Sequence, residues 1–310
     1  MDINGRELSE ELLDDLITKI KEKDELSAVP NEIVTDGIIT VLKKDSNLLD
    51  KLLTGKKAPF KMVLKDVRAS LHRIHGSFHT DIKQRDELLA RYEKEKDDDI
   101  IVELLKTHAS TKERLEIYEN LYETLFRICA RPDSILDIGC GLNPLSCIFM
   151  DRPQDVFYSA YDISQPDLDM VKRFFSLYGI EGTVSILNLF KARSENIFQQ
   201  VGKHNICFLF KVLEIIEQTK SHKISENIIM TAPADTVVVS FPKRTMSGNA
   251  MRYPRRGWIE QMLRRLAIPW DIIDYQNEIF YVIFKSKQLE QPKRPKENAS
   301  SKKASEKQTA

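Results

Sequence analysis

The stretch ILDIGCGLNPLS (residues 135–146) decides the fold class of this chain. A short apolar strand runs here into a glycine-rich turn, which accommodates either the pyrophosphate of a dinucleotide or the methionyl part of S-adenosylmethionine (SAM). The dinucleotide fingerprint requires a third glycine where this chain has Pro144. A proline suits the first turn of a helix but removes an N–H group that a pyrophosphate would bind. Because SAM carries no phosphate, the stretch favours SAM.

Two positions further along the chain agree with this interpretation. Asp162 ends the next predicted strand, about 20 residues beyond Gly141, which fits a carboxylate that binds the two ribose hydroxyls. The third predicted strand ends at Asn188 and Leu189, a polar and an apolar side chain suited to adenine. The alternative is purely structural, with the glycines serving a tight turn and Asp162 capping a helix.

The chain from residue 134 onwards alternates short apolar strands with helical segments. This alternation predicts βαβ units and a mostly parallel sheet that is covered on both faces. The last two strands are separated by only a few residues, which predicts an antiparallel hairpin at the sheet edge. The expected strands are SILDIG, VFYSAYDI, TVSILNL, NICFLF, TVVVSFP, WDIIDY and EIFYVIF.

The first part of the chain carries apolar residues at helical spacing instead. The segments ELSEELLDDLITKIKEK, NEIVTDGIITVLKK and FKMVLKDVRASLHRIHGSF predict amphipathic helices. The tail from residue 285 has eight basic residues, three acids and almost nothing apolar, which predicts disorder. We therefore expect a helical domain over residues 1–107, an α/β domain over residues 108–284 and a disordered basic tail over residues 285–310.

The charge is zero overall but unevenly distributed. Residues 55–79 hold six Lys or Arg against one acid, and residues 243–265 hold seven against one. Two basic stretches in a neutral protein favour a phosphate-rich partner, although scattered solvated charge is the simpler alternative. The four cysteines lie in or beside apolar runs without CxxC pairing, which favours reduced thiols in the cytoplasm. No apolar run approaches the roughly 18 residues of a membrane span.

The segment HASTKERL (residues 108–115) has the pattern of a capping box. Ser110 would cap a helix that runs to Ala130, and Glu113 would bond back to the cap. That interpretation leaves His108 and Arg114 unexplained.

Together with LHRIHGSF, LDIGCGLNPLS, FKVLEII and VSFPKRTMSG, this segment resembles the aminoglycoside-resistance 16S rRNA methyltransferases that methylate guanine N7 in the decoding A site. The resemblance covers roughly residues 60–284. It implies a class I SAM-dependent methyltransferase (Rossmann-like) domain, preceded by a helical domain that docks on the 30S subunit. It also implies a cytoplasmic monomer that binds 16S rRNA and no membrane.

The resemblance further implies a set of SAM contacts. Arg114 would pair with the SAM carboxylate, which suits a bidentate guanidinium. The other implied contacts are Phe78, His108, Ala109, Ser110, Gly139, Gly141, Asp162, Asn188, Leu189 and Phe210.

No catalytic base is expected, because guanine N7 has an in-plane lone pair and no proton to lose. Candidate residues for the target pocket are Lys211, Phe241, Lys243 and Arg244, with Phe241 or Trp258 stacking on a flipped base. Two features depart from the family near this pocket: Glu214 stands where relatives have a neutral residue, and the segment NAMRYPRRGW is short and arginine-rich.

The histidines at 72, 75 and 79 share one helical face, but no Cys or acid cluster completes a metal site, so no metal is expected. The alternatives that remain open are a different RNA target, such as A-site adenine N1, and a ribosome-binding relative without turnover. Either would keep the fold.

Overall fold

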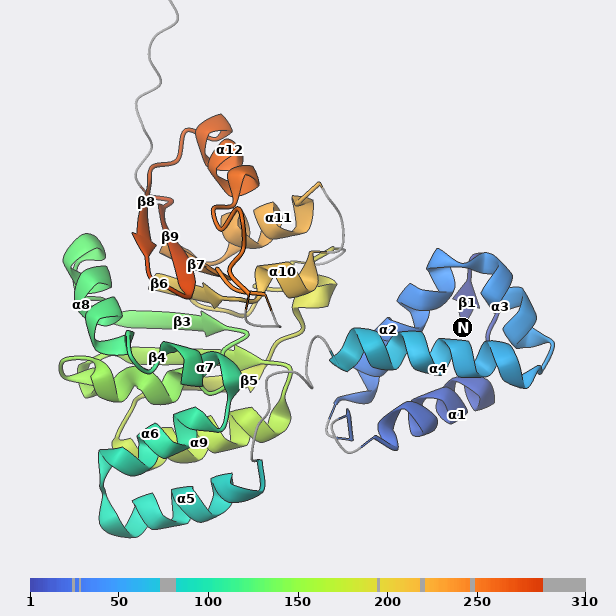
Figure 1. Ribbon diagram of the computed structural model, residues 1–310, viewed down its shortest axis with the longest axis horizontal. Helices are drawn as coiled ribbons and strands as arrows, with labels where there is room; N and C mark the ends of the chain where they lie inside the picture. Colours follow the sequence, from blue (N-terminus) through green and yellow to red (C-terminus); the bar gives the residue numbers. More distant parts are fainter. Residues whose placement is uncertain are drawn as a thin grey trace, which may run out of the picture.

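The computed structural model describes residues 1–23, 26–27, 29–72, 82–193, 196–217, 221–245 and 249–286. Phe78, the histidines at 75 and 79, and the predicted disorder beyond residue 286 lie outside these residues. Figure 1 shows a small helical unit beside a larger α/β unit.

The helical unit folds around a core of its own. A two-residue hairpin, β1 (Asp2–Ile3) with β2 (Arg6–Glu7), precedes α1 (Glu10–Lys21), α2 (Asn31–Lys44), α3 (Ser46–Leu53) and α4 (Lys57–Leu71). Side chains cap two of these helices: Ser9 accepts from the Leu12 amide at 3.3 Å, and Asp45 accepts from the Leu48 amide at 3.0 Å. The buried leucines, isoleucines and valines of these elements form one hydrophobic cluster.

The next two helices, α5 (Ile82–Glu95) and α6 (Asp98–Lys106), do not belong to that cluster. Leu89 and Tyr92 of α5, and Ile101 and Leu104 of α6, are buried in the core that covers one face of the sheet. The sequence predicted a domain boundary after residue 107, but the hydrophobic cores divide between α4 and α5. We therefore propose that the helical domain ends before α5.

The sheet has seven strands in the order β5-β4-β3-β6-β7-β9-β8. The five strands from β5 to β7 are parallel, and β9 pairs antiparallel with both β7 and β8. This confirms the predicted class I methyltransferase fold with its antiparallel C-terminal hairpin. The strands are β3 (Ser134–Ile138), β4 (Phe157–Asp162), β5 (Gly182–Ile186), β6 (His204–Phe210), β7 (Ala234–Pro242), β8 (Trp270–Asp274) and β9 (Glu278–Phe284).

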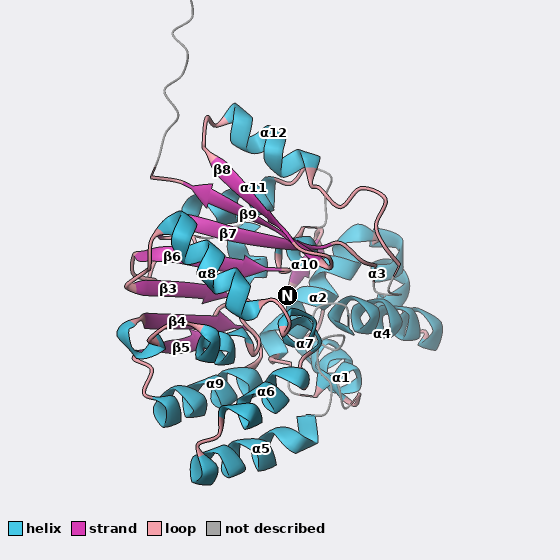
Figure 2. Ribbon diagram, turned by 60° about the vertical axis from the view of Figure 1, so that its left-hand side comes forward, coloured by secondary structure: helices cyan, strands magenta, loops and turns pink. Residues whose placement is uncertain are grey.

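Helices cover both faces of this sheet (Figure 2). One face packs against α5, α6, α8 (Tyr118–Cys129), α9 (Gln165–Tyr178) and η3 (Asn143–Phe149). The other packs against α10 (Leu213–Ile216), α11 (Lys223–Thr231), α12 (Gly257–Arg265) and η5 (Leu189–Arg193). Successive side chains of a strand point to opposite faces of the sheet, so Ile135 lies in the first core and Leu136 in the second.

Cys140, Cys147 and Cys207 are buried and all four cysteines are free thiols, as expected.

Among the described helices, none combines the length and the apolar character needed to cross a membrane. The short 3₁₀ segment η4 (Pro153–Asp155) leads into β4.

The helical unit contacts the sheet near the end of β4 and at η5. Ile163, which follows β4, packs against the helical core. Lys191 of η5 forms an ion pair with Glu32 of α2. The helical domain is thus attached beside the carboxyl ends of the parallel strands.

Candidate cofactor and target site

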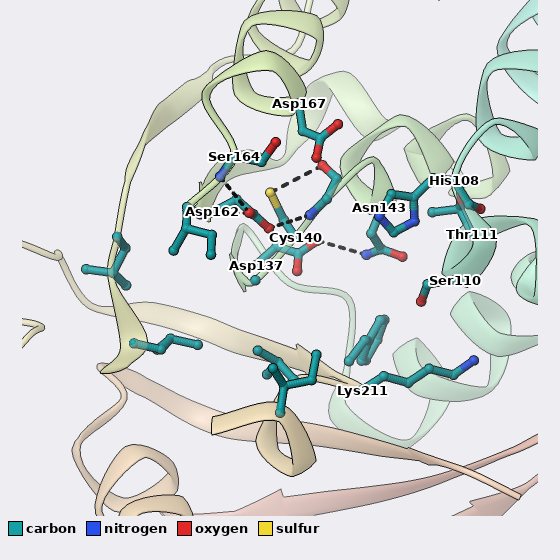
Figure 3. A pocket seen from close by; sticks show the side chains of 18 of the residues that line it. His108, Ser110, Thr111, Asp137, Cys140, Asn143, Asp162, Ser164, Asp167 and Lys211 are labelled. Atoms are coloured by element: carbon teal, nitrogen blue, oxygen red, sulfur yellow. Dashed lines mark hydrogen bonds between the residues drawn. The ribbon is translucent and has the colours of Figure 1, made fainter. Parts of the chain in front are cut away.

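A cavity lies at the carboxyl ends of β3, β4 and β6, where parallel α/β sheets bind their ligands. It holds about 830 Å³ of empty space, part of which is open to solvent. In Figure 3, His108 and Ser110 approach it from α7 (Ala109–Arg114), Asp162 lies at the end of β4, and Lys211 lies across the cavity from Asp162. Eight of the eleven sequence-predicted cofactor residues line it: His108, Ser110, Arg114, Gly139, Gly141, Asp162, Leu189 and Phe210.

The remaining predicted residues differ in their positions. Ala109 begins α7 and Asn188 is buried, but neither is among the residues that line the cavity. Asn188 donates to Asp36 of α2 at 3.4 Å. The strand that was expected to end at Asn188 ends at Ile186, because β5 stops pairing with β4 at Asp162. Phe78 lies outside the described residues.

The two glycines of the turn after β3 have no room for a side chain. Gly139 and Gly141 adopt φ values of 67° and 49°, in the left-handed region that favours glycine. A Cβ atom on Gly139 would lie 2.7 Å from Val212 Cγ2, and one on Gly141 would lie 2.8 Å from Nε2 of His108. The glycines therefore let the turn approach neighbouring side chains and a ligand closely.

Asp162 lines the cavity and bonds the backbone around it. Its carboxylate accepts from the Gly141 amide at 2.8 Å and from the Ile163 and Ser164 amides at 2.7 and 2.9 Å. It therefore fixes the glycine turn, and an oxygen of this carboxylate retains acceptor capacity toward the cavity. Burial, reinforced by Asp167, raises the pKa of Asp162 to about 6.

Arg114 is fully buried and held by an acid that is distant in sequence. Its Nε lies 2.9 and 3.0 Å from the two carboxylate oxygens of Glu278 in β9. Its Nη1 lies 3.4 Å from Oδ1 of Asn143, and its guanidinium stacks over the ring of Phe210 at 4.9 Å. Burial by itself would lower the pKa of Arg114, but Glu278 and Tyr118 outweigh it and raise that pKa.

One atom of Arg114 remains without a partner. Nη2 is buried and makes no hydrogen bond within the described part of the chain, although Arg114 lines the cavity. A buried guanidinium N–H without an acceptor is costly, so this site is suited to an anionic ligand group. The carboxylate of SAM is such a group.

Sequence analysis did not identify Glu278, Asp137 or Asn143. Asp137 is buried in β3, and its Oδ2 accepts from Asn143 Nδ2 and Tyr158 OH, both at 2.8 Å. Burial raises the pKa of Asp137 to about 6. Asn143 links Asp137 to Arg114, so a continuous polar network runs under the cavity. A polar residue inside an apolar strand was the available signal for Asp137 and Glu278.

The predicted capping box is wrong. His108, and not Ser110, is the N-cap of α7, and no side chain makes a capping hydrogen bond there. Ser110 is buried at the cavity, while Glu113 forms an ion pair with Lys211. The helix was also expected to run to Ala130, but α7 ends at Arg114 and α8 begins at Tyr118.

Of the four candidates for the target pocket, only Lys211 lines the cavity. Its backbone has φ 58°, and its ammonium group contacts Glu113 and, at 3.2 Å, Glu278. Lys243 bonds the Tyr275 carbonyl at 2.7 Å, and Nε of Arg244 bonds Asn277 at 2.8 Å. Both are thus tied to the β8–β9 turn.

Phe241 is packed inside the protein and is not accessible to a base. Its side chain is 0% exposed within the second core, where it packs edge-on against Trp258 and Tyr281. Trp258 is partly buried and stacks on His222 at 4.3 Å. The two departures from the family pattern meet here instead: Glu214 pairs with Arg256 of the arginine-rich segment at 2.7 Å.

The chain resembles known proteins over most of its length. The chain is 25% identical over 234 residues to the 16S rRNA (guanine(1405)-N(7))-methyltransferase of Micromonospora rosea, covering 72% of this chain and 82% of the relative. The enzyme of the same name from Proteus mirabilis is 25% identical over 209 residues, covering 61% and 71%.

Solved structures share the fold. The 16S rRNA methyltransferase RmtF in complex with S-adenosyl-L-homocysteine matches with a TM-score of 0.68 and 22% identity, covering 90% of this chain and 99% of that chain. The 16S rRNA methylase ArmA matches with a TM-score of 0.51 and 26% identity, covering 64% and 97%. A model of the family described as ribosomal RNA methyltransferase (FmrO) matches residues 48–282. This chain therefore belongs to the FmrO family of SAM-dependent ribosomal RNA methyltransferases.

Proposed function

We propose that this enzyme transfers a methyl group from SAM to N7 of the A-site guanine of 16S rRNA, position 1405 in bacterial numbering, within the 30S subunit. The observation that carries the proposal is the buried, unpartnered Nη2 of Arg114 in a cavity built by the glycine turn. The guanine target is supported by the names of the curated relatives. Methylation there would add positive charge to the drug site and so confer aminoglycoside resistance.

Each lining residue has a proposed role toward the cofactor. Arg114 Nη2 donates to the SAM carboxylate, while Asp162 accepts from a ribose hydroxyl. Gly139 and Gly141 leave room for the methionyl chain, and Leu189 packs against the adenine ring. Bound SAM supplies an electrophilic methyl group on its sulfonium sulfur.

The protein has to align the base and exclude water, because N7 attacks with a lone pair and releases no proton. Lys211 is held at the cavity by two carboxylates, so its ammonium position is fixed before the base arrives. We assign to Lys211 the role of orienting the target base. Phe210 precedes it, and the guanidinium of Arg114 stacks on the Phe210 ring at 4.9 Å.

The helical domain is proposed to dock on rRNA. Lys57, Lys61 and Lys65 follow one another at a spacing of four along α4 and are exposed. None of the three forms an ion pair within the described residues. Unpaired lysines on one helix face suit the phosphate backbone. We propose that the enzyme acts in the cytoplasm as a monomer on assembled 30S subunits.

The test is methylation of purified 30S subunits with labelled SAM, followed by borohydride and aniline cleavage, which breaks RNA at 7-methylguanosine. Cleavage at the A-site guanine is expected. Label without cleavage would show that the methylated atom is a different one, such as adenine N1. SAM binding without any label would refute the proposed activity.

A further inference from the structure

The segment between β7 and α12 exposes one aromatic ring among arginines. Tyr253 is 74% exposed, the largest fraction among the large hydrophobic side chains of the described residues. The guanidinium of Arg252 lies 5.3 Å from the centre of its ring. The ring is therefore accessible to a partner that stacks on it.

This segment is anchored on both sides of Tyr253. On the N-terminal side, the Met251 amide donates to the Lys243 carbonyl at 2.8 Å, and Arg244 and Ala250 form an antiparallel bridge. On the C-terminal side, the Arg256 side chain is largely buried and its guanidinium donates to three oxygen acceptors as well as to Met251 Sδ. The oxygen acceptors are Glu214 at 2.7 Å, the Pro254 carbonyl at 2.7 Å and the Pro242 carbonyl at 3.2 Å. The position of Tyr253 is therefore fixed by its neighbours.

The anchor connects this segment to the cavity wall. Glu214 belongs to α10, and its neighbours Val212, Ile215 and Ile216 line the cavity. The ion pair of Glu214 with Arg256 therefore holds the arginine-rich segment at the same end of the sheet as the cofactor cavity. In Figure 2, the loop that enters α12 lies at the end of β7 nearest α10.

The charge of this segment suits RNA. Residues 249–256 include three arginines and no acid. Arg252 has no acidic partner within the described residues, whereas Arg255 pairs with Glu260 at 2.8 Å. An exposed tyrosine beside an unpaired arginine is the combination that binds single-stranded nucleotides, through stacking on the base and attraction to the phosphate.

We infer that Tyr253 stacks on an unpaired rRNA base next to the methylated nucleotide, with Arg252 contacting the adjacent phosphate. This rests on the proposed function. Tyr253 thereby supplies an exposed stacking surface, whereas Phe241 and Trp258 are packed against one another. The Glu214–Arg256 pair is a positioning contact for this segment.

The test compares Tyr253→Ala, Tyr253→Leu and Tyr253→Phe with the wild type in methylation of purified bacterial 30S subunits. Stacking on a base predicts that the Ala variant loses roughly 5- to 150-fold in kcat/KM. The Leu variant should lose a similar amount because it lacks a flat ring, while the Phe variant should stay within about twofold of the wild type. SAM affinity, measured by calorimetry, should be unchanged in all three.

The outcomes separate this inference from the proposed function. If wild-type protein does not methylate 30S subunits, the proposed function fails. If wild-type protein is active and Tyr253→Ala is equally active, the stacking role is wrong. Full activity of Tyr253→Leu, or loss of SAM binding in Tyr253→Ala, would also overturn it.

Discussion

Replacing Glu278 by Gln tests the buried network that holds the cofactor arginine. The substitution keeps the shape of the side chain but removes the negative charge between Arg114 and Lys211, whose side chains are 2% and 8% exposed. Removing one partner of a buried ion pair typically costs 3–5 kcal/mol. Lys211 retains Glu113, and Gln retains an oxygen for Arg114 Nε, so we expect a loss near the lower end, about 3 kcal/mol.

The free energy of unfolding can be measured in urea by tryptophan fluorescence. The chain has two tryptophans, Trp258 and Trp270, and both lie in the α/β domain, so the signal reports this domain. Glu260→Gln is the control, because the Glu260 side chain is also mostly buried, at 10% exposed, but pairs with the exposed Arg255 and Arg264. Exposed pairs are worth at most about 1 kcal/mol.

A Glu278→Gln variant that loses less than about 1 kcal/mol, like the control, would refute the reasoning. It would mean that the two buried cations do not depend on this carboxylate. A loss that matches the expected size should be accompanied by weaker SAM binding, because Arg114 would no longer be held in place.

Three further results are expected. Asp137→Asn should stabilise the protein by about 1–3 kcal/mol at pH 8 and by little at pH 3 in urea unfolding. Burial raises the pKa of Asp137 to about 6, so stability from this group is fully present below its unfolded value of 3.8 and is lost as pH rises through 6; a pH-independent difference would contradict this. Arg114→Lys should lower SAM affinity tenfold or more in calorimetry, because lysine keeps a cation beside Glu278 but lacks the free Nη2; unchanged affinity would refute the carboxylate contact. The double variant Lys61→Glu, Lys65→Glu should weaken 30S binding and leave SAM affinity unchanged. Loss of both 30S binding and SAM binding would show that the docking surface is assigned wrongly.

Local sequence patterns were sufficient for the fold class and much of the cavity. Strand periodicity located the seven strands because a strand half-buried or fully buried in a sheet requires its apolar residues at fixed positions. The glycine turn and the spaced Asp162 marked the cofactor side, since close backbone approach and a left-handed φ restrict the residue type. These constraints act between residues that are close in the chain, so they can be recognised from the sequence alone.

The rest depended on contacts between distant residues. Arg114 and Glu278 are 164 positions apart, and no local rule connects α7 with β9. The capping-box pattern at Ser110 was overridden because that side chain is buried at the cavity. Likewise, Phe241 fits the expected strand pattern, but its side chain is buried in the second core. Only the packed sheet shows that this ring cannot reach a base.

The sequence by itself determined a SAM-binding, mostly parallel α/β domain with a helical N-terminal part, because turns, caps and strand periods are local. Only the tertiary structure decided that α5 and α6 share the core of the sheet, and that Glu214 of α10 pairs with Arg256, three residues beyond the exposed Tyr253. The physical reason is that burial and charge pairing are properties of the packed chain. A side chain's neighbours, more than its position in a motif, set what it is available to bind.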